Sequence, residues 1–311
     1  MSFVLLTVAI VFAFSAQRAS AQSSAETPSQ IHELLIHALQ TGKLDEAIET
    51  GRRAVARWPR DPEMKHLLGL AYFKTGQHAL ATQELQEAES LDTSNPDIHF
   101  DLALVYLDQG QYSPAADELR QATKLDPGNA TAHLLLGRAF QNTNRTVEAV
   151  EQFKAALKLN PEIPLGHYHL GFAYASLGRN QEAIAEYEKE IAVRPGDANL
   201  LYQLGHLLLQ AGDWKSATTY LQQAAQAKPS DEDIFYDLGK ALVLAGNSAS
   251  AVSAFERCAE LKPADPSPHY QMARALDHMG RHEEARHEWQ AFNELTKAQP
   301  QTGGMASGQA Q

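Results

Sequence analysis

Histidine and cysteine are the residue types in this chain that could do metal or nucleophilic chemistry. The sequence has 13 histidines and 1 cysteine. A zinc site of the H-E-x-x-H kind needs two histidines four residues apart, so that both rings share one helix face. The nearest match to this motif is the segment 282–287, where Glu283 follows His282 but the second histidine, His287, lies five residues on. That spacing turns the two rings about 140° apart on a helix. We therefore predict an exposed polar helix start here and no metal site.

Other histidines and the cysteine fall at fixed places of an internal repeat described below. Each of these histidines stands at position 4 of its repeat, on the face that packs against the neighbouring helix, so we predict a half-buried ring with one hydrogen bond and no metal role. The lone Cys258 stands where neighbouring repeats have alanine, which predicts a small packed residue and not a nucleophile. One cysteine also excludes an intrachain disulfide and a multi-cysteine metal site. The histidines are His99, His133, His167 and His269.

Catalytic motifs are absent from the sequence. It has no G-x-S-x-G, P-loop, G-x-G-x-x-G or H-E-x-x-H, and so lacks the usual signatures of a nucleophile elbow, a phosphate cradle, a dinucleotide site or a metalloprotease. We predict a non-enzymatic protein without a cofactor. An enzyme is the weakest alternative, because only residues 300–311 lie beyond the repeats to supply further structure.

Charge and composition narrow the class of partner. The 311 residues carry 26 Lys+Arg against 38 Asp+Glu, a formal net charge of −12. Because phosphate contacts need a basic surface, we expect no nucleic-acid partner. Hydrophobic residues make up 44% and aromatic residues only 8%, which predicts a core of small and aliphatic side chains.

The N-terminus resembles an export signal. Residues 3–14 are an apolar run, and Ala19-Ser20-Ala21 fits the A-x-A cleavage rule, so we predict a signal peptide over 1–21 and a linker over 22–27. The alternative is an uncleaved membrane anchor, but a spanning helix needs about 20 apolar residues and Arg18 ends the run early. We expect an exported protein, periplasmic or secreted if the source is bacterial, with membrane contact only through an uncleaved signal segment.

A period of 34 residues organises the rest of the chain. A turn marker recurs at this spacing, and an alanine follows each marker by five residues in all eight copies. Asn fills one marker place, which fits because Asn tolerates the left-handed conformation that Gly supplies at a helix end. The markers are Gly42, Gly76, Gly110, Asn144, Gly178, Gly212, Gly246 and Gly280.

Eight repeats without insertion follow from this period. Each holds two helices of about 13 residues, because apolar or small residues recur with helical spacing at positions 4, 7, 8 and 11 and again at 20, 24 and 27, counted from the start of each repeat. Proline at position 32 closes six of the repeats. The repeats are 28–61, 62–95, 96–129, 130–163, 164–197, 198–231, 232–265 and 266–299.

The pattern resembles the tetratricopeptide repeat family. In the fifth repeat the matching residues are Leu170, Gly171, Tyr174, Gly178, Ala183, Tyr187 and Pro195. The resemblance implies an all-α solenoid, a right-handed superhelix of helix–turn–helix pairs whose first helices line a concave groove. Three departures are Leu35 in place of Gly, Thr93 in place of Pro, and Glu190 at position 27. For Glu190 we weigh an ion pair with Arg194 against a side chain that points outward.

The groove candidates lie at positions 5, 9 and 12 of the first helices. These point about 90–150° away from the packing stripe. Tyr and Arg are frequent at binding hot spots, so we predict a peptide-binding groove; the alternative is that the tyrosines pack between adjacent first helices. The carboxylate clamp of chaperone-tail binders in this family is not reproduced, which leaves the ligand class open. The predicted groove residues are Tyr168, Tyr202, Tyr236, Tyr270, Arg138, Phe172, His206, Lys240 and Arg274.

The C-terminal repeat poses a separate question, because repeat arrays usually end in a polar capping helix. Here Trp289, Phe292 and Leu295 lie on the last expected helix. We predict that they fold down within the eighth repeat as a cap, and that 300–311 is disordered. The preferred function is an exported scaffold for a protein or peptide ligand; the alternative is an assembly protein that self-associates, for example as a homodimer, through its terminal repeats.

Overall fold

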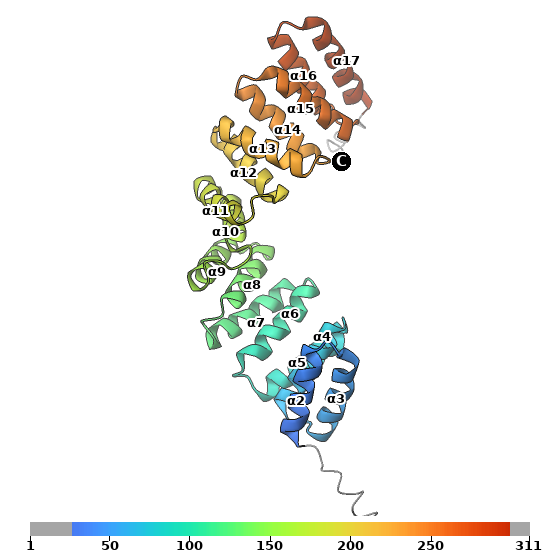
Figure 1. Ribbon diagram of the computed structural model, residues 1–311, viewed down its shortest axis with the longest axis vertical. Helices are drawn as coiled ribbons and strands as arrows, with labels where there is room; N and C mark the ends of the chain where they lie inside the picture. Colours follow the sequence, from blue (N-terminus) through green and yellow to red (C-terminus); the bar gives the residue numbers. More distant parts are fainter. Residues whose placement is uncertain (1–26, 299–311) are drawn as a thin grey trace, which may run out of the picture. The chain divides into compact units, whose positions relative to one another are not determined.

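Residues 27–298 are described by the computed structural model, and within them the chain is all helix, with no strand (Figure 1). This confirms the predicted fold class. The predicted signal peptide and the tail 300–311 lie outside the described residues. The helices are α2 (Pro28–Gln40), α3 (Leu44–Arg57), α4 (Pro62–Lys74), α5 (His78–Leu91), α6 (Pro96–Asp108), α7 (Tyr112–Leu125), α8 (Ala130–Asn142), α9 (Thr146–Leu159), α10 (Gly166–Ser176), α11 (Asn180–Val193), α12 (Ala198–Ala211), α13 (Trp214–Ala227), α14 (Glu232–Leu244), α15 (Ser248–Leu261), α16 (Ser267–His278) and α17 (His282–Ala298).

The chain divides into two compact units, residues 1–143 and 144–311. Within each unit, consecutive helices pack against each other: α2 to α8 in the first and α9 to α17 in the second. The boundary falls at Asn144, the turn marker of the fourth repeat. No helix of residues 27–298 is long and apolar enough to cross a lipid bilayer.

Turn geometry explains the 34-residue marker. All seven marker glycines have φ between 70° and 84°, and Asn144 has φ 59°. Such values belong to the left-handed region that Gly adopts freely and Asn tolerates. The prediction that Asn144 replaces a glycine at this turn is therefore confirmed.

Helix starts are fixed by the last residue of the preceding repeat. The Asp61 side chain accepts hydrogen bonds from the N–H groups of Glu63 and Met64, and Pro62 occupies the first helical position. Both features stabilise a helix N-terminus. The fifth repeat differs, because Ile163 offers no cap; α10 begins late, after Leu165 at φ 65°.

Large and small residues interlock between the two helices of a repeat. A Cβ added to Gly239 at position 8 would lie 2.5 Å from the ring of Phe255 at position 24. The first repeat reverses this arrangement, since the fully buried Leu35 stands at position 8 and Gly51 at position 24. A Cβ added to Gly51 would lie 2.9 Å from Cδ1 of Leu68 on α4 and 3.5 Å from Cδ2 of Leu35. The glycine therefore makes room for Leu68 of the next repeat and leaves Leu35 in ordinary contact, which is why this departure leaves the fold intact.

Glu190 is buried and paired. One carboxylate oxygen lies 2.9 Å from Nε of Arg194, and the other accepts the N–H of Tyr168 at 3.2 Å. The side chain is only 6% exposed. The predicted ion pair is confirmed, and the alternative of an outward-pointing side chain is wrong.

The aromatic side chains of α17 fold against their own repeat. The rings of Trp289 and Phe292 each lie 5.4 Å from the ring of Tyr270, and Nε1 of Trp289 donates to Asp277 at 3.0 Å. All three rings are half-buried. For Trp289 and Phe292 the predicted self-cap is therefore the arrangement observed in the eighth repeat, and Leu295 is half-buried on the same helix.

Candidate functional site

The four predicted tyrosines lie one each on α10, α12, α14 and α16, and all are half-buried. We predicted that they face away from the partner helix, and for three of them this is wrong. Position 5 points about 110° from the centre of the packing stripe, but the long side chain of tyrosine reaches back to the partner helix. The ring pairs are Tyr168 with Tyr187 and Tyr236 with Phe255, both at 5.9 Å, and Tyr270 with Phe292 at 5.4 Å.

Tyr202 differs from the other three tyrosines. Its ring lies 5.9 Å from the ring of His206 on its own helix. Burial raises the pKa of the Tyr202 hydroxyl, and the neighbouring Asp237 raises it further. Tyr202 is therefore a neutral hydrogen-bonding group beside an acidic residue from the next repeat.

Asp237 joins two of the predicted groove residues. Its carboxylate lies 2.6 Å from Nδ1 of His206 and 3.1 Å from Nζ of Lys240, and the residue is 5% exposed. Burial by itself would raise the pKa of Asp237, but the hydrogen bonds and charges of His206 and Lys240 hold it below its ordinary value. The predicted basic strip is therefore largely neutralised at this point.

Arg274 keeps its charge uncompensated. Its guanidinium lies over the ring of Tyr270, 5.6 Å from the centroid. No carboxylate within residues 27–298 comes within ion-pair distance of it. Arg274 is exposed, so it can pair with an anionic group from outside the chain.

A cleft of about 700 Å³ opens beside Arg274, between α14, α16 and the turn that follows α14. Its polar groups include Lys240, Arg274 and Gln271, whose side-chain amide donates to the hydroxyl of Tyr236 at 3.4 Å. The cleft thus combines a free cation with an apolar wall. Its lining residues are Lys240, Val243, Leu244, Gly246, Asn247, Ser248, Ala249, Gln271, Arg274, Ala275, His278 and Met279.

Several predicted groove residues lie elsewhere. Phe172 is 37% exposed on α10 and does not line the cleft. Arg138 is exposed on α8, in the 1–143 unit, whereas the four tyrosines belong to the 144–311 unit. The structure therefore brings Lys240 and Arg274 to one site, with Tyr236 and Tyr270 as their neighbours.

Sequence reasoning missed Asp237, Gln271, His278 and Met279. They stand at repeat positions 6, 6, 13 and 14. Positions 6 and 13 lie beside position 9 on the helix surface, whereas Met279 follows the end of α16. A wider angular window would have included Asp237, Gln271 and His278 but not Met279.

Family models match most of the described chain. One described as "TPR repeat" matches residues 69–110 and 104–144, one described as "Tetratricopeptide repeat" matches 137–198 and 202–266, and another of that description matches 266–291. The chain belongs to the tetratricopeptide repeat family. No curated protein matches the sequence significantly.

Solved structures of tetratricopeptide repeat proteins share the fold. A crystal structure of MamA is 25% identical with a TM-score of 0.51, covering 52% of this chain and 95% of MamA. MamA from Desulfovibrio magneticus RS-1 is 23% identical with a TM-score of 0.51, covering 55% and 96%. YrrB, described as a TPR protein with an unusual peptide-binding site, is 19% identical with a TM-score of 0.54, covering 58% and 94%. The likeness supports a tetratricopeptide repeat solenoid.

Proposed function

We propose that this protein is a non-catalytic scaffold that binds a segment of another protein in the cleft between α14 and α16. The observation that carries the proposal is the uncompensated guanidinium of Arg274 at the edge of an apolar cleft. A concave, largely apolar site with a few fixed polar groups is the usual form of a binding site. YrrB supplies a precedent for peptide binding on this fold.

The lining chemistry favours a particular kind of segment. Val243, Leu244 and Met279 offer apolar contact, and Arg274 offers a forked donor for a carboxylate. Lys240 already forms an ion pair with Asp237, so less of its positive charge is available to a bound peptide. A peptide that places a carboxylate, from a side chain or its own C-terminus, next to an apolar side chain satisfies both parts of the cleft.

We propose in addition that the scaffold works outside the cytoplasm. The apolar run 3–14 and the triplet Ala19-Ser20-Ala21 support export. The partner would then be a protein of the same compartment.

Binding to a peptide array tests the proposed function. Each peptide of a random twelve-residue array is presented with a free and with an amidated C-terminus, and the purified protein is applied at low and high salt. We expect bound peptides to be acidic or to need the free carboxylate. Arg274→Glu should lower their affinity at least tenfold, since a charge-assisted hydrogen bond becomes a repulsion.

Arg286→Glu is the matched control, because Arg286 lies on α17 of the same repeat and is 73% exposed in a surface pair with Glu283. It makes the same change of net charge outside the cleft and should leave binding unchanged. Equal binding by the parent and Arg274→Glu, or equal losses in both variants, would contradict the proposed site.

A further inference from the structure

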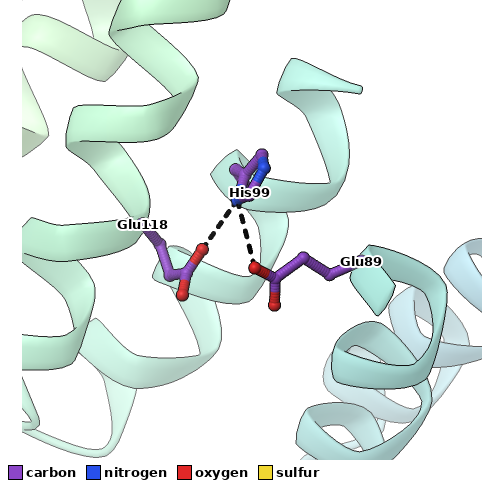
Figure 2. Close-up of side chains that lie close together, drawn as sticks. All are labelled: Glu89, His99 and Glu118. Carbon is purple, nitrogen blue, oxygen red and sulfur yellow. Dashed lines mark hydrogen bonds and ion pairs between the residues drawn. The ribbon is translucent and has the colours of Figure 1, made fainter. Parts of the chain in front are cut away.

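Three side chains that can ligate a metal converge in the first unit: Glu89 from α5, His99 from α6 and Glu118 from α7 (Figure 2). Nδ1 of His99 lies 2.8 Å from Oε2 of Glu118 and 3.8 Å from Oε1 of Glu89. The His99 side chain is only 4% exposed, and those of Glu118 and Glu89 are 18% and 31% exposed. Two carboxylates therefore face one edge of a buried imidazole.

The hydrogen bond at the opposite edge of the ring shows which ring nitrogen of His99 is protonated and which can bind a metal ion. Nε2 of His99 lies 3.2 Å from the carbonyl oxygen of Thr93. A carbonyl only accepts hydrogen bonds, so Nε2 carries the proton. When His99 is protonated, Nδ1 donates to Oε2 of Glu118 at 2.8 Å. When the ring is neutral, Nδ1 presents a lone pair to the two carboxylate oxygens, and the place of that proton is open to a metal ion. A metal-bound histidine typically donates its second N–H to a carbonyl in this way.

Other repeats show which part of the cluster is ordinary packing. The same pair of positions, 4 and 23, is occupied by His167 with Glu186 at 2.5 Å and by His269 with Glu288 at 2.7 Å. In each of these two repeats the cluster consists of one histidine and one glutamate, with no second carboxylate. In the preceding repeat, position 28 is Glu89 before His99, but Leu157 before His167 and Ala259 before His269. The third carboxylate distinguishes the His99 cluster from its two counterparts.

We propose that Glu89, His99 and Glu118 bind a divalent transition-metal ion of the zinc class, with water in the remaining position. One nitrogen and two oxygen ligands suit such an ion. Ligand atoms of a tetrahedral zinc site lie about 3.4 Å apart, and the three ligand atoms here all lie within 4.8 Å of one another. Small side-chain shifts complete the site. This departs from the packing role predicted for His99 from sequence.

The proposed site has a structural consequence, because its ligands come from the second and third repeats. A bound ion would link α5 to the α6–α7 pair, and binding to the folded state alone stabilises that state. The ion would also balance the two carboxylates, which the ring in its neutral form leaves uncompensated.

Titration of the untagged protein, first freed of metal with a chelator, tests the proposal. Zn²⁺ is followed by calorimetry, and Co²⁺ by its visible absorption, which reports ligand geometry. We expect one ion per chain and a rise in the thermal midpoint. Glu89→Leu copies the residue of the fourth repeat and should weaken binding at least tenfold, with the metal-free midpoint and helical content confirming that the variant folds.

Glu186→Gln is the matched control, because it removes the equivalent carboxylate from the fifth repeat, where Leu157 replaces the third ligand. It should bind Zn²⁺ like the parent. A parent protein that binds no Zn²⁺ or Co²⁺ at micromolar concentration would overturn the proposal. So would a Glu89→Leu variant that binds as tightly as the parent, since the ion would then sit on other histidines.

Discussion

Cys258 illustrates at the residue scale how position removes reactivity from a side chain. The residue is 2% exposed on α15, and burial, followed by the nearby carboxylates of Asp265 and Glu232, raises the pKa of its thiol to about 11. The thiolate is the nucleophile. At pH 8 about one thiol in a thousand is ionised, against roughly a quarter for an ordinary cysteine of pKa about 8.5. The predicted packing role is consistent with this environment.

We therefore predict that Cys258 reacts with a chromogenic disulfide reagent at least about a hundredfold more slowly than free cysteine at pH 8. Because the raised pKa lies above this range, the rate should still climb between pH 8 and pH 10. Absorbance of the released thiolate measures it. In denaturant the rate should return to that of free cysteine; equal rates in folded and unfolded protein would show that the thiol is accessible.

Residue-level predictions succeeded where the partner lies on the same helix. The Glu190–Arg194 pair needed only a spacing of four, and Asn144 needed only the turn period. The Asp237 contacts with His206 could not be predicted in the same way, because one residue lies on α12 and the other on α14. Periodicity gives the face on which a side chain lies, but not the residue that meets it from the next repeat.

At the scale of elements, interlocking of positions 8 and 24 sets how closely paired helices approach. A Cβ at Gly239 would lie 2.5–2.7 Å from three ring atoms of Phe255, whereas a Cβ at Gly205 would meet the branched end of Leu221, 2.7 Å from its Cγ. A leucine side chain can make room for an added Cβ by changing its rotamer. A phenylalanine ring is rigid, so in a close-packed core the whole ring has to shift. The third repeat already combines Ala103 with Leu119, both fully buried.

We predict that Gly239→Ala lowers the free energy of unfolding by about 1–2 kcal/mol, since overpacking outweighs the gain in helix propensity. Gly205→Ala should stay within about 0.5 kcal/mol of the parent, because there the two effects nearly cancel. Urea denaturation followed by circular dichroism gives both values. Equal effects of the two substitutions would mean that the side chain at position 24 does not control the approach of the helices.

Helix boundaries could largely be predicted, because glycine or asparagine follows the end of each first helix, and an Asp or Asn at the end of most repeats caps the first helix of the next repeat. The start of α10 could not. The preceding repeat ends in Ile163 in place of the capping residue, and Leu165 takes a left-handed conformation that costs a non-glycine residue about 1–2 kcal/mol. The 34-residue period continues through this segment, so nothing in the spacing signalled the change.

At the scale of the whole molecule, the end of the array decides between a scaffold and a self-assembling protein. Trp289 and Phe292 pack on Tyr270, so the last repeat covers much of its own apolar surface. We predict a monomer by light scattering at micromolar concentration. Phe292→Glu should leave the mass unchanged and lower the thermal midpoint, because it removes packing within the repeat. A parent dimer that dissociates on this substitution would instead support the assembly alternative.

The candidate site is also formed by more than one repeat, and this limits how much of it could be predicted from the sequence. The 34-residue spacing identified Lys240 and Arg274 one at a time. The cleft, however, is formed by two adjacent repeats and the turn between α14 and α15, so its walls include residues from places outside the predicted stripe. Arg138 had the same repeat position as Arg274, yet it belongs to the other compact unit.

The exchange of Leu35 and Gly51 in the first repeat carries a consequence for how such an array can diverge. The bulk that other repeats place on the second helix is here on the first. Either half of the exchange alone has a cost: glycine at both positions leaves a leucine-sized cavity, and a large side chain at position 51 would overlap Leu68 of the next repeat, 2.9 Å from an added Cβ. A direct exchange therefore passes through a less stable ancestor. The Ala103–Leu119 pair of the third repeat shows that the same backbone also accepts smaller steps, so repeats of one array can diverge gradually at this contact.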